Sequence, residues 1–559
     1  MGKGKTFFGL RGQALNYAVG LVAGCDFLLF GYDQGVMGGI LTMPQFLDVF
    51  PSINPDDPAI AHDAGLKSQR STIQGIAVAS YNLGCFLGAL ISIFISDRLG
   101  RKRMIILGTS IMIIGAALQA SSSTLPHLIV GRIITGLGNG GNTSTVPTWQ
   151  SETSRSHKRG KLVMIEGALI TGGITLSYWI DLGFSFAPGT LAWRFPIAFQ
   201  IAFCLFILAF IWNLPESPRW LILKKREDEA REVLAALADT TADDKYVRDE
   251  FLAIKETVLE MQKGTFADLF KMTKDREFHR TLLAYVNQVF QQISGINLIT
   301  YYAAVIYSGL NLGGFLSRLL AALNGTEYFL ASWPAVYLVD RVGRRKLMIF
   351  GAAGQAATMA ALAGAASLTG GDNPPKGPSI AVIALLFIFN TFFAVGWLGM
   401  TWLYPAEIVP LKIRAPANAL STSANWIFNF LVVIITPIAF NNIGYQTYII
   451  FAVINAFMVP SVYFFYPETA YRSLEEMDAI FHKAHGIRGY FDVVRVAKHE
   501  PRRYGRDGEL LIAYDETEEH KSHLHPQAQM FEERSDDSAV ERGSAGGSGG
   551  SGGAGGVMA

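Results

Sequence analysis

The chain has 559 residues, of which half are hydrophobic and only 17% are charged. Soluble domains carry about a quarter charged residues, so this composition indicates a protein that folds in lipid. The 47 Lys and Arg residues nearly balance the 46 Asp and Glu residues, which leaves no global charge for a nucleic acid or an acidic partner to recognise. The three cysteines, Cys25, Cys85 and Cys204, all lie in apolar runs and predict no disulfide framework.

Apolar runs long enough to cross a bilayer recur along the chain. A spanning helix takes about 20 mostly apolar residues. After a polar N-terminal segment, residues 1–14, such runs predict six helices over 15–213 and six more over 281–466. The first run is too long for a signal peptide. The spans are expected at 15–39, 73–96, 104–121, 126–148, 161–185, 192–213, 281–309, 316–339, 347–368, 379–404, 415–440 and 446–466.

The segments outside these runs are polar. Residues 214–280 are rich in charges and carry amphipathic helical patterns at 227–237 and 250–261, which predict a cytoplasmic helical linker between the two halves. Residues 467–559 are expected to form a cytoplasmic tail, disordered beyond about residue 485. The sequence therefore predicts an all-α integral membrane protein with twelve transmembrane helices.

Basic residues set the expected orientation. Lys and Arg gather at 98–103, 155–161 and 341–346, whereas the largest loop on the other side, 40–72, is acidic. The positive-inside rule then places both termini in the cytoplasm. In this topology Asn324-Gly-Thr326 is a glycosylation sequon in the outer loop between the seventh and eighth spans.

The two halves repeat one another. The loop Asp97-Arg-Leu-Gly-Arg-Lys-Arg103 follows the second span, and Asp340-Arg-Val-Gly-Arg-Arg-Lys346 follows the eighth. Likewise, Pro215-Glu-Ser-Pro-Arg-Trp220 follows the sixth span and Pro467-Glu-Thr-Ala-Tyr-Arg472 the twelfth. Duplication of a six-helix unit is the layout of the major facilitator fold.

Charged residues at the inner ends of the helices belong to the same repeat. Carboxylates and guanidiniums there can pair when the cytoplasmic side closes and separate when it opens. Because carboxylates contribute nothing to the positive-inside bias, we favour an intracellular gate over a role in topology alone. The expected gate residues are Asp97, Arg101, Glu152, Arg159, Asp340, Arg344, Glu407 and Arg414.

The sequences of these motifs resemble those of the sugar porter family of the major facilitator superfamily, and the resemblance extends over roughly residues 15–485. The motifs are D-R-L-G-R-K, D-R-V-G-R-R-K, G-R-I-I-T-G, P-E-S-P-R-W and Q-Q-I-S-G-I-N. The stretches V-M-I-E-G-A-L-I and G-W-L-G-M-T-W-L-Y-P-A-E-I-V-P resemble fungal monosaccharide transporters in particular. The resemblance implies a plasma-membrane carrier, most simply a monomer in lipid, and not an enzyme. No nucleophile–base pair, metal cluster or phosphate loop predicts a cofactor.

Polar side chains inside the spans predict where substrate binds, because they are costly in lipid. The seventh span carries Gln288, Gln291, Gln292 and Asn297, and Ser294-Gly295 predicts that the helix unwinds there to line a cavity. Amides both donate and accept hydrogen bonds, which suits a sugar's hydroxyls. The resemblance implies that Gln291, Gln292, Asn297, Trp402 and Asn425 contact the sugar.

The sequence departs from well-known relatives at several positions. Glu166 stands in the fifth span where mammalian and bacterial members carry a glutamine, and we include it among the expected substrate contacts. Tyr328 stands where glucose facilitators have an asparagine, and the tenth span lacks their double-proline pattern. These departures leave the identity of the sugar open.

An acid and a base in the first half predict proton coupling. Asp33 lies roughly 24 Å from the inner end of the first span, and Arg132 lies roughly 9 Å from the outer end of the fourth. At similar depth in a core about 30 Å thick, the two are expected to pair, and their separation would favour proton uptake. The resemblance implies the same roles: in proton-coupled sugar porters of bacteria and plants, the residue matching Asp33 binds the proton and the residue matching Arg132 is its partner.

Proton symport of a hexose or pentose is therefore the expected function. Facilitative uniport of the same sugars is the main alternative, since yeast hexose facilitators also keep the acid. A carrier for disaccharides or quinate-type compounds, and a sugar sensor that moves nothing, remain further alternatives.

Overall fold

The computed structural model describes residues 7–60, 62–153, 159–262, 264–370, 374–472, 474–484 and 489–501. Within these ranges the side chains of 159–161, 260, 262, 415, 474 and 475 lie outside the description. Residues 1–470 and 477–499 form one compact unit, which contains the whole helical bundle. A second unit combines 471–476 with 500–559, most of which lies beyond the described residues.

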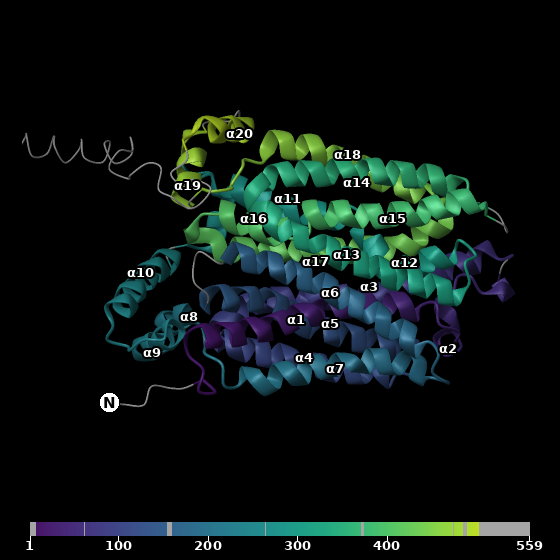
Figure 1. Cartoon of the computed structure of the whole chain (residues 1–559), viewed down its shortest axis with the longest axis horizontal. Helices are drawn as coiled ribbons and strands as arrows, with labels where there is room; N and C mark the ends of the chain where they lie inside the picture. Colours follow the sequence, from purple (N-terminus) through teal and green to yellow (C-terminus); the bar gives the residue numbers. More distant parts are fainter. Residues whose placement is uncertain are drawn as a thin grey trace, which may run out of the picture. The chain divides into compact units, whose positions relative to one another are not determined.

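Six long helices build the first half of the bundle. They appear together as the purple-to-blue block of Figure 1. At 1.5 Å per residue, even the shortest of them is about 30 Å long, the thickness of a bilayer core. The six are α1 (Gly12–Ile40), α3 (Ala64–Leu99), α4 (Arg101–Ala120), α5 (Leu125–Thr153), α6 (Arg159–Phe184) and α7 (Leu191–Ile211).

The second half repeats this layout with two of its members broken. It forms the teal-to-green block of Figure 1. The seventh expected span is the pair α11 (Glu277–Ile293) and α12 (Ile296–Ser308), and the tenth is the pair α15 (Lys376–Gly396) and α16 (Met400–Ile408). The unbroken members are α13 (Gly314–Val342), α14 (Arg344–Ser367), α17 (Arg414–Ile443) and α18 (Gln446–Phe465).

Short helices gather at the two ends of the bundle. The linker contains α8 (Pro218–Leu223), α9 (Glu227–Ala238) and α10 (Lys245–Gln262), which lie at the same end as α19 (Leu474–Lys483) and α20 (Gly489–His499) in Figure 1. The small helix α2 (Pro44–Leu47) lies at the opposite end. Both amphipathic patterns of the linker are confirmed as helices. Helix α20 corrects the expectation of disorder beyond about 485, and residues 502–559 lie outside the described part.

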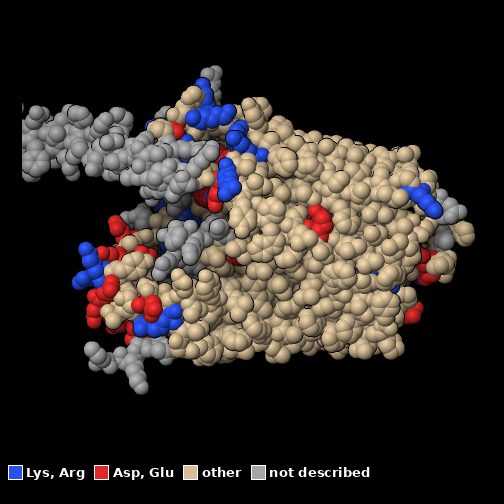
Figure 2. All heavy atoms as spheres, in the orientation of Figure 1, with Lys and Arg blue, Asp and Glu red and all other residues tan. Residues whose placement is uncertain are grey.

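The surface of the bundle is that of a protein in lipid. Large apolar side chains such as Phe94, Phe457 and Leu330 are more than 60% exposed. Figure 2 shows charged side chains concentrated at the two ends, with a wide band between them that is almost free of charge. Ten helices of the described chain, counting each broken pair once, are long and apolar enough to cross a membrane. Helices α5 and α13 have 29 residues each but fall outside that set of ten.

Glycines let the helices of the first half pack closely, as small residues do in membranes. A Cβ atom on Gly136 of α5 would lie 2.1 Å from the carbonyl oxygen of Tyr81 on α3. Glycine is therefore required for α3 and α5 to approach at this distance. The contact positions Tyr81 beside the charged residues of the first half.

The glycosylation expectation for Asn324 is wrong. Asn324 lies within α13, not in a loop, and its side chain is 3% exposed. Its Oδ1 accepts a hydrogen bond of 2.9 Å from Nδ2 of Asn390 on α15. Asn324 is thus buried against α15 inside the bundle and is unavailable to a modifying enzyme.

Candidate functional site

The break between α11 and α12 lies at Ser294 and Gly295, as the sequence predicts. Gly295 has a φ of +105°, which only glycine adopts without strain. Nδ2 of Asn455 donates to the freed carbonyl of Ser294 at 2.7 Å. The turn also brings Asn297 back toward α11, where its Nδ2 donates to Oε1 of Gln292 at 2.6 Å.

A second break faces the first. Helix α15 ends at Gly396 and α16 begins at Met400, which leaves backbone carbonyls of the intervening residues without helical partners. Nε2 of Gln291 donates to the carbonyls of Trp397 and Leu398 at 3.3 and 3.2 Å. The irregular backbone of the second half is thereby satisfied by the amides of α11.

These amides form one connected network. Asn425 on α17 donates through Nδ2 to Oε1 of Gln288 at 2.7 Å and to Oε1 of Gln291 at 3.1 Å. Nε2 of Gln292 donates to the same Gln291 oxygen at 2.9 Å. Because each amide is held by another, their orientations are set before any ligand binds, which lowers the entropy cost of binding.

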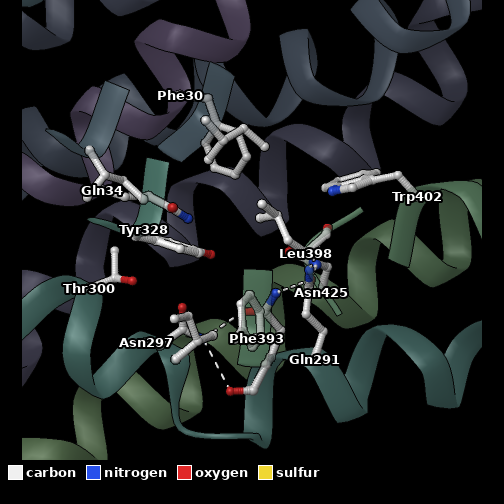
Figure 3. A pocket seen from close by; sticks show the side chains of 14 residues that line it. Phe30, Gln34, Gln291, Asn297, Thr300, Tyr328, Phe393, Leu398, Trp402 and Asn425 are labelled. Carbon is white, nitrogen blue, oxygen red and sulfur yellow. Dashed lines mark hydrogen bonds between the residues drawn. The ribbon is translucent and has the colours of Figure 1, made fainter. Parts of the chain in front are cut away.

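The network borders a pocket between the two halves. About 430 Å³ of space that no atom fills, part of it open to solvent, lies among its walls. Figure 3 shows Gln34, Tyr328, Thr300 and Asn297 on one side of the pocket and Trp402, Asn425 and Gln291 on the other. The lining residues are Phe30, Gln34, Ile170, Ile174, Gln291, Gln292, Ile296, Asn297, Thr300, Tyr328, Phe393, Leu398, Trp402 and Asn425.

The two halves contribute unequally to this lining. Every polar group except Gln34 comes from the second half, while the first half presents Phe30, Ile170 and Ile174. Within the described chain, the structure records no protein hydrogen bond for the Gln34 amide, the Tyr328 hydroxyl or the Trp402 indole N–H. A ligand therefore finds most of its donors and acceptors on the second half, and mainly apolar side chains on the first half.

Five of the six expected substrate residues line the pocket. The exception is Glu166, which is 5% exposed on α6 but is not among the lining residues. Helix α6 reaches the pocket with Ile170 and Ile174 instead, one and two turns further along. Gln34 and Thr300 were missed, although Gln34 is a polar residue next to Asp33 within a span and so carried a usable signal.

The expected ion pair between Asp33 and Arg132 is not formed. Both residues lie in the described part of the chain, each at most 2% exposed, and no salt bridge joins them. Instead, the guanidinium lies 5.5 Å from the centre of the Tyr81 ring and its Nη2 donates to the Val78 carbonyl at 3.0 Å. The Tyr81 hydroxyl lies 3.5 Å from Oδ2 of Asp33.

Tyr81 thus stands between the acid and the base. Its hydroxyl also accepts a hydrogen bond of 2.8 Å from Nδ2 of Asn139 on α5, which orients the phenol toward Asp33. Equal depth correctly predicted that the charges lie in one region. It could not show that an aromatic ring from a third helix separates them.

Two of the expected gate arginines, Arg101 and Arg344, form ion pairs within their own halves, at the end of the bundle opposite α2. Arg101 contacts Glu152 and Asp97, each at 3.2 Å. In the second half Arg344 contacts Glu407 at 2.8 Å and Asp340 at 2.9 Å. Arg414 donates to the Val409 carbonyl at 3.1 Å, and the side chain of Arg159 lies outside the description.

The P-E-S/T motifs hold the same contacts in both halves. Glu216 accepts backbone N–H bonds from Arg101 and Lys102, at 3.1 and 3.2 Å. Glu468 accepts the equivalent bonds from Arg344 and Arg345, at 2.9 and 3.2 Å. The sequence repeat is therefore also a repeat of hydrogen-bonded geometry.

Hydrogen bonds between the halves occur at the opposite end, near α2. The Tyr178 hydroxyl on α6 donates to the Thr300 carbonyl on α12 at 2.8 Å. The Tyr301 hydroxyl donates to Oδ1 of Asn82 on α3 at 2.9 Å. We call this group of contacts the α2-side seal. The halves are joined there, while the ion pairs of Arg101 and Arg344 at the other end lie within their own halves.

Two duplicated helix bundles around a polar pocket, with broken helices lining it, define a membrane carrier of the major facilitator fold. A solved structure of the proton:xylose symporter XylE supports the fold: its TM-score with this chain is 0.71 at 24% identity, over 84% of this chain and 99% of XylE from Escherichia coli. Residues 19–481 match the family model described as sugar (and other) transporter.

Curated relatives agree with that match. The sugar transporter STL1 of Saccharomyces cerevisiae is 38% identical over 93% of this chain and 88% of its own length. The major facilitator superfamily transporter mfsA of Aspergillus fumigatus is also 38% identical, over 86% of this chain and 88% of its own length. The chain belongs to the sugar transporter family of the major facilitator superfamily, whose members are membrane carriers and not enzymes.

Proposed function

We propose that this protein moves a monosaccharide, hexose or pentose, across the plasma membrane by alternating access, coupled to a proton. The observation that carries the proposal is the preorganised amide network of α11, α12 and α17 around a pocket between the two halves. Amides that are already fixed by one another present donors and acceptors to hydroxyl groups at little entropy cost. Broken helices at the midplane are the usual site of substrate in such carriers.

The pocket favours a particular placement of the sugar. The hydroxyl groups of the sugar bind the amides of α11, α12 and α17, which are Gln291, Gln292, Asn297 and Asn425. The indole N–H of Trp402 supplies a further donor. The C–H face of the ring then lies against Phe30, Ile170 and Ile174. Since the first half supplies little but apolar contact, specificity for hydroxyl configuration resides in the second half.

Proton coupling follows from Asp33, Tyr81 and Arg132. A buried carboxylate in a span is costly, and Arg132 is held by Val78 and the Tyr81 ring instead of pairing with it. Movement of α1 relative to α3 and α5 changes the distance from Asp33 to both groups and so changes its affinity for a proton. One proton moving through 100 mV supplies about 2.3 kcal/mol, enough for roughly fifty-fold accumulation.

The remaining parts of the proposal concern topology and gating. We infer twelve membrane crossings, with α5 and α13 completing the ten apolar helices, both termini in the cytoplasm, and the protein acting as a monomer. The inner charges then re-pair between halves when the cytoplasmic side closes, while the α2-side seal opens outward. Pairs that can exchange partners suit a gate with two states.

Uptake into cells that lack sugar carriers tests the proposal. Radiolabelled glucose, galactose, xylose and cellobiose are compared with and without a protonophore. Accumulation of a monosaccharide that the protonophore abolishes supports symport, and protonophore-insensitive equilibration would show uniport instead. Asp33→Asn should lose accumulation while keeping sugar exchange. If this variant still accumulates sugar along a proton gradient, the role given to Asp33 is wrong.

A further inference from the structure

Asp181 is a buried carboxyl group that the proposed transport cycle leaves without a role. It lies on α6, one turn before the helix ends at Phe184 near α2. Its side chain is 0% exposed. Neither carboxylate oxygen accepts a hydrogen bond of normal geometry from any described protein group. Such a group is rare, because buried carboxylates nearly always have donors.

The side chain of Asp181 packs tightly against the backbone of α1. A Cβ atom on Gly39 would lie 2.4 Å from Oδ2 of Asp181, so the carboxylate is pressed against the α1 backbone. The N–H of Gly39 approaches it but is committed to the ladder of its own helix. Close packing against glycine holds the acid in this position.

The nearest cation comes from the opposite half and is used elsewhere. Arg318 on α13 lies close enough to Asp181 for their charges to interact, yet no ion pair joins these two described residues. Nη1 of Arg318 instead donates to the carbonyl oxygen of Thr42, just beyond α1, at 3.1 Å. Both partners of a potential ion pair thus lie at the α2-side seal without meeting.

Among the described residues, the other ionisable groups whose charges interact with Asp181 are tyrosines, which carry no positive charge. They are Tyr178 on α6, Tyr32 on α1 and, beside Tyr178, Tyr307 on α12. The hydroxyls of Tyr178 and Tyr32 donate to the carbonyls of Thr300 and Pro196. No neighbouring hydroxyl among these described residues is therefore oriented to stabilise an ionised carboxylate at this position.

We propose that Asp181 is a proton-binding site, and that it takes a proton whenever the α2-side seal closes around it. A carboxylate ion without donors is strongly disfavoured in a protein interior, whereas the neutral acid is tolerated. When the halves part at this end, water reaches the carboxyl group and it ionises. The proton comes from, and returns to, the solution on the α2 side, so this site is separate from net coupling through Asp33.

The inference goes beyond sugar transport and rests on two parts of the proposed function: the opening and closing of the α2-side seal, and the orientation in which the α2 side faces outward. It predicts that external pH sets how long the outer side stays open. If one proton binds per closure, the ratio of open to closed molecules rises by up to about tenfold per pH unit above the pKa of the hydrated carboxyl group. A neutral residue at position 181 removes that dependence.

A cysteine next to the α2-side seal, at a further contact between the halves, measures the opening of the outer side without any sugar. Thr175 on α6 is half-buried and its Oγ1 donates to the Gly325 carbonyl on α13 at 2.7 Å, so the position becomes accessible when the halves part. Thr175→Cys is labelled with a membrane-impermeant maleimide in right-side-out vesicles of fixed internal pH, with the external pH varied between about 5 and 8. The labelling rate of Thr175→Cys at each pH is divided by the rate of the double variant Thr175→Cys/Asp181→Asn at the same pH. This ratio corrects for the increase in thiol reactivity with pH, which both proteins share.

The comparison decides the proposal. We expect the labelling rate of Thr175→Cys, divided by that of Thr175→Cys/Asp181→Asn, to rise severalfold or more with external pH. The same ratio measured for Thr175→Cys/Asp181→Glu should also rise with pH. The dependence should survive in Asp33→Asn. Equal pH profiles with and without Asp181→Asn, or a response to Na⁺ or K⁺ in place of pH, would overturn it.

The orientation is checked in the same experiment. Inside-out vesicles expose the opposite face to the maleimide. If the cysteine is labelled only there, the proposed orientation is wrong, and the same pH comparison made from that side decides the role of Asp181. Should Asp181→Asn fail to reach the membrane, Asp181→Ser provides a second neutral variant.

Discussion

Replacing Asn297 by alanine tests whether the amide network binds substrate. Asn297 is 4% exposed and its Nδ2 donates to the Gln292 carbonyl at 3.2 Å and to Gln292 Oε1 at 2.6 Å. The substitution removes the bonds that orient Gln292, together with the proposed contact between Asn297 and the sugar. With two or three hydrogen bonds of about 1 kcal/mol each, we expect a loss of about 2–3 kcal/mol in binding.

That loss corresponds to an increase of roughly 30- to 150-fold in the KM for sugar, provided KM reports binding. Uptake is measured over a range of sugar concentrations and divided by the amount of protein at the cell surface. Asn213→Ala, a matched change at an exposed asparagine after α7, should leave KM unchanged. If Asn297→Ala lowers surface protein and maximal rate together at constant KM, the network serves packing and not sugar recognition.

Three further changes examine other parts of the structure. Tyr81→Phe removes the hydroxyl between Asp33 and Asn139, so the pH optimum of accumulation should shift by about one unit while sugar exchange continues; an unchanged pH profile would show that Tyr81 only packs. Gly295→Val places a β-branched residue at φ +105°, with its Cβ 2.8 Å from Cε of Met359. The backbone strain costs about 1–3 kcal/mol or more, so transport should fall at least tenfold. A variant with the KM and rate of the wild type would show that the break between α11 and α12 does not require glycine. In the linker's 3₁₀ segment Phe266–Phe270, a hydrogen bond from Lys271 and the backbone N–H of Thr265 hold the pKa of Asp268 well below its usual range. A carboxyl pKa that is lower in the folded than in the unfolded protein stabilises the fold at pH values above the unfolded-state pKa of about 4. In thermal unfolding of detergent-solubilised protein, Asp268→Asn should therefore be less stable than wild type at neutral pH. The difference in stability should shrink as the pH falls below about 4.

Much of this architecture can be predicted from local signals. Hydropathy alone placed all twelve expected ranges on helices or on helix pairs, because the length of an apolar run reflects the thickness of the bilayer. The Ser294-Gly295 break was also predictable, since glycine in mid-span permits a backbone conformation that other residues avoid. The repetition of the P-E-S/T motifs was visible in the sequence, but their contacts with the loops after α3 and α13 were not, because Glu216 and Glu468 lie more than 110 residues from their partners.

The rotation of each helix about its axis was not predictable in this way. Residue number along a span gives depth, and depth correctly brought Asp33 and Arg132 into one region. Depth says nothing about the direction in which a side chain points around the helix axis. For this reason the sequence did not predict that Tyr81 lies between the two charges or that Asn324 is buried. It also did not predict that α6 lines the pocket with Ile170 and Ile174 and not with Glu166. Direction is decided by how neighbouring helices pack, and in a membrane this depends on small residues such as Gly136 and Gly39 that let particular faces approach. Hydrophobicity cannot supply that information, because lipid and helix interior are equally apolar.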